Sequence, residues 1–138
     1  GGDLVKAQHL LRQKGLATAA KKADRETLEG LVESYVHSGG QIGAMVEVNC
    51  ETDFVARTEG FKVLVHDLAM QVAAMDPKYI DFSDLPENDE SVSKDSCLLQ
   101  QAFIREPDLT VKDRVNEIIA QVGENVRIRR FVRYTLGD

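Results

Sequence analysis

The spacing of apolar residues changes between residues 42 and 73 from every second position to every third or fourth position. Alternation is typical of a strand with one buried face, and the longer spacing is typical of an amphipathic helix. Because so few residues separate the two patterns, the chain must turn sharply from a strand into a helix that starts at Glu59. The alternating positions are Ile42, Ala44, Val46, Val48 and Cys50, and the helical positions are Phe61, Leu64, Val65, Leu68, Ala69, Val72 and Ala73.

A partner strand is predicted just upstream, from Leu31 to His37. Residues 38–41 (Ser-Gly-Gly-Gln) separate the two runs, and paired glycines between such runs are typical of a hairpin turn. The glycines also suggest a phosphate-binding loop, because Gly43 follows closely. The turn is favoured, since the spacing matches neither the dinucleotide fingerprint nor the P-loop and no Gly-Lys-Ser/Thr sequence follows.

The corner between strand and helix carries the sequence Thr-Asp-Phe-Val, residues 52–55. A hydroxyl and a carboxylate at a helix start accept hydrogen bonds from the free N–H groups and meet the positive end of the helix dipole. Phe54 has no such local use, so its ring either fills the core or is held out for a partner. Large apolar side chains are usually buried, and residue type alone therefore favours the core. Glu51 and Asp53 could form a carboxyl pair, but a helix-start device is the simpler interpretation.

The N-terminal part is predicted to hold one short helix over residues 3–14, ended by Gly15. Such a helix is too short to be stable alone and needs a partner surface. Residues 16–25 are rich in Ala and Lys without a strong period, so we interpret them as a linker with some helical character. The predicted domains are accordingly 1–25 and 26–138.

The C-terminal part is predicted to contain a helix and a strand. Thr110 and Asp113 resemble a capping box at the start of the helix, and Gly123 ends it. The segment 125–136 alternates, with Arg130 breaking the apolar side as a bulge would. The apolar side is predicted to hold Val126, Ile128, Val132, Tyr134 and Leu136, and the opposite side Arg127, Arg129 and Arg133.

Composition argues against two classes of function. A net charge of -6 speaks against wide non-specific nucleic-acid binding, which needs a basic surface. No apolar stretch approaches the roughly 20 residues that span a bilayer. The arginines of residues 127–133 could grip phosphate, but a charged outer face that guards an edge strand is favoured in this acidic chain. Acidic residues gather in 77–95, which is predicted to be a solvated loop.

The sequence carries no familiar catalytic or metal-binding motif. Cys50 and Cys97 lack metal-ligand spacing and form no disulfide framework, which favours a reducing compartment. His9, His37 and His66 lie on three different predicted elements. Neither Gly-x-Ser-x-Gly nor His-Glu-x-x-His occurs. We therefore expect an interaction module rather than an enzyme, with no catalytic residue, cofactor or metal ligand.

Four sequence blocks follow one another over most of the chain. The longest spans 37–57 and contains His-Ser-Gly-Gly-Gln-Ile-Gly and Val-Glu-Val-Asn-Cys-Glu-Thr-Asp-Phe-Val-Ala-Arg. The others are 14–22, with Lys-Gly-Leu and Ala-Ala-Lys-Lys, then 66–74, and finally 123–131, Gly-Glu-Asn-Val-Arg-Ile-Arg-Arg-Phe. In sequence and in order these blocks closely resemble the translation elongation factor Ts family, the guanine-nucleotide exchange factors of elongation factor Tu.

This resemblance implies a partner and a site. The partner would be elongation factor Tu, in its GDP-bound and nucleotide-free forms, and Thr52, Asp53, Phe54 and Val55 would form the tip that enters its nucleotide domain. Asp53 and Phe54 would wedge between two helices there and disturb the magnesium site, so that GDP leaves. Phe54 is then expected to be exposed. The implied location is the bacterial cytoplasm or an organelle stroma or matrix, with no membrane and no direct nucleic-acid binding expected.

The predicted elements give an α+β fold, in which a small antiparallel sheet of the hairpin plus the C-terminal strand packs against helices. The single Thr-Asp-Phe-Val block resembles the single-core branch of the family, found in cyanobacteria, plastids and some thermophiles. The family's N-terminal domain has three helices, of which residues 3–14 resemble a remnant, and a longer helical excursion commonly replaces residues 77–98. The oligomeric state stays open between monomer and homodimer. The alternative function is a core domain that binds elongation factor Tu or the ribosome, as part of a larger protein, without effective exchange.

Overall fold

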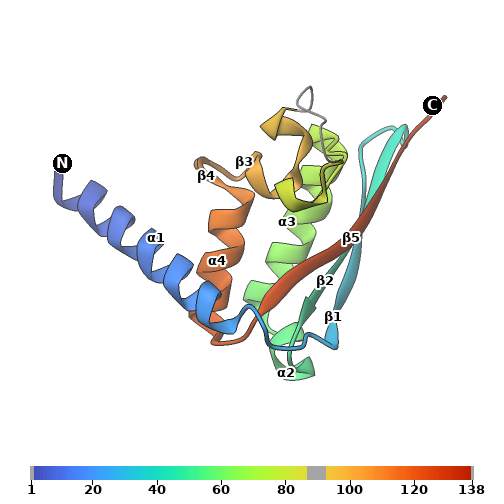
Figure 1. Ribbon diagram of the computed structural model, residues 1–138. Helices are drawn as coiled ribbons and strands as arrows, with labels where there is room; N and C mark the ends of the chain where they lie inside the picture. The colour runs from blue at the N-terminus through green and yellow to red at the C-terminus, as the bar shows by residue number, and fades with distance from the viewer. Residues whose placement is uncertain (1, 87–92, 138) are drawn as a thin grey trace.

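The protein, described by a computed structural model over residues 2–86 and 93–137, has one layer of helices beside a small sheet (Figure 1). The sheet has the strand order β1-β2-β5, with all neighbours antiparallel. Its strands are β1 (Glu29–Val36), β2 (Ile42–Cys50) and β5 (Val126–Thr135). The predicted α+β fold, with a hairpin joined by the C-terminal strand, is confirmed.

The hairpin forms as the paired glycines predict. The Cα partners of β1 and β2 run from Glu29 opposite Cys50 to Val36 opposite Gly43. Gly39 and Gly40 have φ angles of 94° and 71°, which residues with a Cβ rarely adopt. These two glycines therefore let the chain reverse within a tight turn.

The central helix α3 (Glu59–Met75) covers the inner face of the sheet (Figure 1). Thr58 caps its start by accepting a hydrogen bond from the Phe61 N–H, and Asp76 ends it in the left-handed conformation. The 3.6-residue spacing therefore places one apolar face of the helix against β1 and β2. Fully buried core side chains include Val46, Val48, Phe61, Leu64, Val65, Leu68, Val72, Leu98, Val111 and Ile118.

The second core helix, α4 (Val111–Val122), has both of its predicted ends. The Thr110 hydroxyl accepts from the Asp113 N–H, and the Asp113 carboxylate accepts from the Thr110 N–H, which completes the capping box. Gly123 ends the helix with a φ of 73°. Sequence signals at helix ends are local, and they are reliable here for that reason.

The connection from α3 to α4 consists of short pieces. The 3₁₀ turns are η1 (Phe82–Asp84), η2 (Lys94–Ser96) and η3 (Leu98–Gln100), followed by the paired strands β3 (Ala102–Phe103) and β4 (Glu106–Thr110). The middle of the predicted acidic loop, with Glu87, Asp89 and Glu90, lies outside the described residues.

The N-terminal helix is longer than predicted. Helix α1 runs without a break over Gly2–Lys22, so the prediction that Gly15 ends it is wrong. Most of the predicted linker, residues 16–22, is helical and continues α1. Gly15 is the buried point where α1 meets α4, and an added Cβ would lie 3.4 Å from the carbonyl carbon of Asn116. Ala and Lys are strong helix formers, which explains why the following turns stay helical.

Strand β5 carries a bulge one residue away from the predicted position. Ile128 pairs with Val48 and Arg130 pairs with Glu47, so Arg129 is the extra residue. One extra residue inverts the two faces beyond it. Arg133 consequently turns to the helix side and donates to the Ala73 carbonyl at 3.0 Å. The prediction for the last residues is therefore wrong: Val132, Tyr134 and Leu136 are exposed and do not share the side of Val126 and Ile128.

Candidate functional site

The predicted tip lies at one end of the sheet. Residues Asp53–Ala56 form the single-turn helix α2, at the lower end of the molecule in Figure 1, next to the starts of β1 and α3. Strand β2 leads into it at Cys50, and α3 leaves it at Glu59. The change of apolar spacing thus produces a sharp corner, as predicted.

The four predicted tip residues divide into three exposed ones and one buried one. Thr52 caps α2, its hydroxyl accepting from the Val55 N–H at 3.3 Å. Asp53 faces solvent and pairs with Arg57 at 2.7 Å. Val55 is only 4% exposed, so its side chain anchors the corner in the core. A partner can therefore meet the side chains of Thr52, Asp53 and Phe54, but not that of Val55.

Phe54 is the exposed aromatic ring of the corner. Its side chain is 75% exposed, and hence the expectation from residue type alone, that Phe54 fills the core, is wrong. The exposure matches the expectation that came from the family resemblance. An exposed benzyl group carries a large apolar surface that gains free energy when a partner covers it.

The corner is anchored to the core by buried contacts. Val55 and Ala56 belong to the core, and the Cys50 thiol donates to the Thr52 carbonyl at 3.2 Å. Burial raises the pKa of the Cys50 thiol to about 11, and the negative charge of Glu124 adds to the shift. Cys50 is therefore an uncharged part of the core at neutral pH.

A second set of contacts comes from the turn between α4 and β5, and sequence reasoning missed it. The Glu124 carboxylate accepts from the Glu51 and Thr52 N–H groups at 3.1 and 3.0 Å and from the Thr52 hydroxyl at 2.7 Å. In return, the Glu51 carboxylate accepts from the Asn125 N–H. One sequence signal could have pointed to Glu124. A carboxylate just after a helix C-terminus is disfavoured by the negative end of the helix dipole, so its presence there suggests that it binds hydrogen-bond donors elsewhere in the fold.

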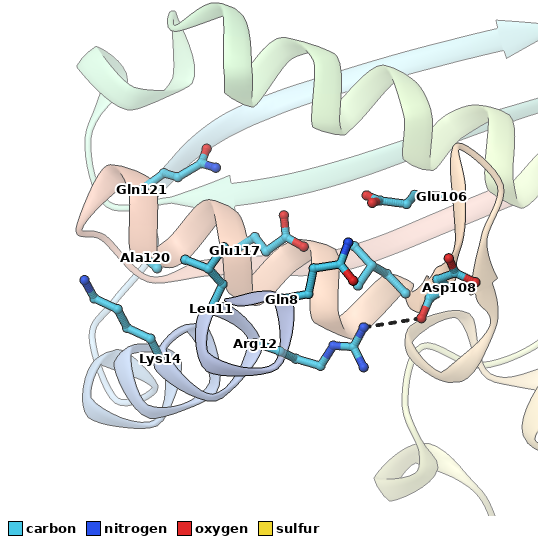
Figure 2. A pocket seen from close by; sticks show the side chains of 10 residues that line it. Gln8, Leu11, Arg12, Lys14, Glu106, Asp108, Glu117, Ala120 and Gln121 are labelled. Carbon is cyan, nitrogen blue, oxygen red and sulfur yellow. Dashed lines mark hydrogen bonds between the residues drawn. The ribbon is translucent and has the colours of Figure 1, made fainter. Parts of the chain in front are cut away.

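The described residues offer weaker alternatives to the tip. A pocket of about 370 Å³ lies between α1 and α4, where Arg12 donates to the Asp108 carbonyl at 3.4 Å (Figure 2). Arg12 also pairs with Asp113 at 3.8 Å, so its charge is already engaged. Over the described ranges, no group of three or more His, Cys, Asp or Glu side chains is placed to hold a metal ion. The helices described there also include none long and apolar enough to cross a bilayer.

Comparison with known proteins identifies the family. Residues 17–94 match the family model described as elongation factor TS. The chain is 47% identical to elongation factor Ts of Carboxydothermus hydrogenoformans, over 99% of this chain and 77% of that relative. It is 48% identical to elongation factor Ts of Thermoanaerobacter sp. strain X514 and 47% identical to that of Moorella thermoacetica, over 99% of this chain and 82% of each relative. The chain therefore belongs to the elongation factor Ts family of translation elongation factors.

Proposed function

We propose that the chain is a guanine-nucleotide exchange factor that binds elongation factor Tu and promotes GDP release through Asp53 and Phe54. Family membership supports the partner and the role. The observation that supports a role of Asp53 and Phe54 in GDP release is the exposure of Phe54 on a corner whose next residue, Val55, is buried in the core. The proposal places the chain where elongation factor Tu works, in a bacterial cytoplasm or an organelle stroma or matrix.

The proposed mechanism is insertion of the tip into the nucleotide domain of the GTPase. Asp53 and Phe54 enter between two of its helices and disturb its magnesium site, which weakens the hold on GDP. An exchange factor must bind the nucleotide-free GTPase more tightly than the GDP-bound form, because only that difference shifts the equilibrium toward release. A tip that is already fixed loses little conformational entropy on insertion.

The ion pair between Asp53 and Arg57 does not oppose this mechanism. Both side chains are mostly exposed, at 67% and 72%, and exposed pairs of this kind contribute little stability. Asp53 can therefore exchange Arg57 for a group on the partner at small cost. Its carboxylate is kept at the start of α2, next to the ring of Phe54.

The test is the release of fluorescent GDP from elongation factor Tu, followed by stopped-flow. The double variant Asp53→Ala with Phe54→Ala is expected to slow catalysed release by about tenfold or more, since burying a Phe ring contributes about 1.5–3 kcal/mol and 1.4 kcal/mol is tenfold. Phe82→Ala removes the same ring from another exposed site and serves as the control. Wild-type release rates in the double variant, with the fold intact by circular dichroism, would contradict the proposal.

A second candidate function is binding to elongation factor Tu or the ribosome, as part of a larger protein, without effective exchange. The observation that supports it is the exposure of apolar side chains on α1, which another part of a larger protein could cover. Leu4, Leu10 and Leu11 are each about two thirds exposed. Binding of normal strength in a pull-down, with no acceleration of GDP release by the wild-type chain, would select this function over exchange.

A further inference from the structure

The Glu124 carboxylate joins the tip to the turn between α4 and β5. Glu124 follows Gly123, the C-terminal cap of α4, and lies 72 residues from Thr52 along the chain. Both of its oxygens are used: Oε1 accepts from the N–H groups of Glu51 and Thr52, and Oε2 accepts from the Thr52 hydroxyl at 2.7 Å. Glu124 therefore fixes the backbone just before the tip helix begins.

The hydrogen-bonding capacity of these groups sets the direction of each bond. A carboxylate can only accept, so the Thr52 hydroxyl must donate its proton to Glu124. The oxygen lone pairs of Thr52 are then left to accept from the Val55 N–H, which lies 3.3 Å away. Glu124 thus orients the hydroxyl that caps α2, and through it the turn that carries Asp53 and Phe54.

The same two turns are connected in the opposite direction. The Glu51 carboxylate accepts from the Asn125 N–H and lies 3.6 Å from the Arg25 guanidinium. The side-chain amide of Asn125 donates to the Arg25 carbonyl at 2.9 Å. The corner before α2, the turn before β5 and the segment before β1 therefore form one connected unit.

A helix of four residues cannot hold its own shape, because isolated helices need about 12–15 residues to be even marginally stable. We infer that Glu124 is a positioning residue for nucleotide exchange, which keeps Asp53 and Phe54 in the orientation that enters the GTPase. This inference rests on the proposed exchange function. It assigns to Glu124 an effect on the rate of GDP release, without contact with the GTPase.

The first test separates the maximal rate of GDP release from the concentration of this protein that gives half of it. In Glu124→Ala the maximal rate is expected to fall by about tenfold, since a misplacement of 1 Å can cost on the order of a hundredfold. The half-saturating concentration is expected to change by less than about twofold, because the surface contacts with the GTPase remain. Glu124→Gln keeps one acceptor oxygen for the two N–H groups and should lie between wild type and Glu124→Ala.

Glu117→Ala supplies the matched control. Glu117 lies on α4, and its carboxylate pairs with Arg114 at 3.2 Å. Its loss should leave both kinetic quantities at the wild-type values. An equal loss of maximal rate in Glu117→Ala and Glu124→Ala would overturn the inference, because it would show a general effect of losing a negative charge from α4 or the turn that follows it.

The second test needs no GTPase. Amide hydrogen exchange, measured by NMR, should become about tenfold faster at Thr52 and Val55 in Glu124→Ala, as expected for the loss of about 1.4 kcal/mol of local stability. The amides of α3 should keep their wild-type rates. Unchanged protection at Thr52 and Val55 overturns the inference whatever the release assay shows.

The two tests distinguish the inference from the function on which it rests. Faster amide exchange with wild-type GDP release overturns the link between Glu124 and exchange, while the proposed function stands. A wild-type chain that fails to accelerate GDP release overturns the proposed function and the kinetic part of the inference together. The amide comparison then still decides whether Glu124 holds the tip.

Discussion

The surroundings of Cys50 make the stability of the protein depend on pH. Its thiol lies beneath the tip, fully buried, and donates to the Thr52 carbonyl. A thiolate in this place would be poorly solvated and would face the negative charge of Glu124. The Cys50 thiol therefore loses its proton at a higher pH in the folded protein than in the unfolded chain.

We predict that this thiol makes the protein less stable at high pH. Its pKa is raised from 9.0 to about 11 by folding, so its contribution is complete below pH 9 and is lost as the pH rises through 11. Urea unfolding of wild type and Cys50→Ala at both ends of this window measures the effect. The free energy of unfolding should fall more steeply in wild type, and parallel losses in the two proteins would contradict the prediction.

Single residues of the tip show what residue type can and cannot predict. The cap at Thr52 is correctly predicted, because a hydroxyl at a helix start acts within three residues along the chain. Phe54 and Val55 are both apolar, yet one is 75% and the other 4% exposed. Their difference follows from the direction in which α2 leaves the sheet, and this direction depends on Glu124 and on the core, far away in the sequence.

At the scale of elements, α1 offers a direct test of why it continues through Gly15. Its Gly15 lies in the helical conformation against the backbone of Asn116, where an added Cβ would be at van der Waals distance, 3.4 Å. Gly15→Ala is expected to raise the free energy of unfolding by up to about 1 kcal/mol, the difference in helix propensity. Urea unfolding measures this change.

The control for Gly15→Ala is a larger side chain at the same position. Gly15→Val adds two methyl groups to a Cβ that already touches α4, so α1 should separate from α4 and become sensitive to proteolysis. If the alanine variant lost about 1 kcal/mol instead, Gly15 would be needed as glycine, as expected for a residue that ends a helix.

Strand β5 shows how a correct local signal can give a wrong face. The interruption of alternation near Arg130 predicts a bulge, and the structure has one at Arg129. Alternation before the bulge, however, says nothing about the faces after it, because one extra residue inverts them. Arg133 therefore lies under the sheet beside α3, and Tyr134 is exposed. Only the pairing with β2 fixes this register, and it involves residues about 80 positions away.

For the molecule as a whole, the class of fold was predictable from the sequence. The structure of the segment that connects α3 to α4 was not. Strand, turn and helix signals between residues 31 and 75 are local, and they determine the hairpin and α3. The connection from α3 to α4 has no such periodicity. Its short turns and strands are shaped by tertiary contacts, above all by a buried amide, Gln71, on the helix that covers the sheet.

Gln71 accordingly carries the last prediction. Its side chain is fully buried; it donates to Gln101 Oε1 and the Ala102 carbonyl at 3.1 and 3.0 Å and accepts from the Ile104 N–H at 2.9 Å. Leu has a similar volume but pairs with none of these groups. Gln71→Leu is expected to lower the free energy of unfolding by about 2–3 kcal/mol, since each buried polar group left unpaired costs about 1–3 kcal/mol.

Urea unfolding measures this loss, and Gln121→Leu, on the solvent-exposed part of α4, controls for the change of residue type. A loss below about 0.5 kcal/mol, as at ordinary surface sites, would contradict the prediction. The tip should be unaffected, because α2 is held by Glu124 and by the core beneath Val55 rather than by this connection. Folded Gln71→Leu protein should therefore accelerate GDP release from elongation factor Tu at the wild-type maximal rate, which separates the stability of the molecule from the geometry of its tip.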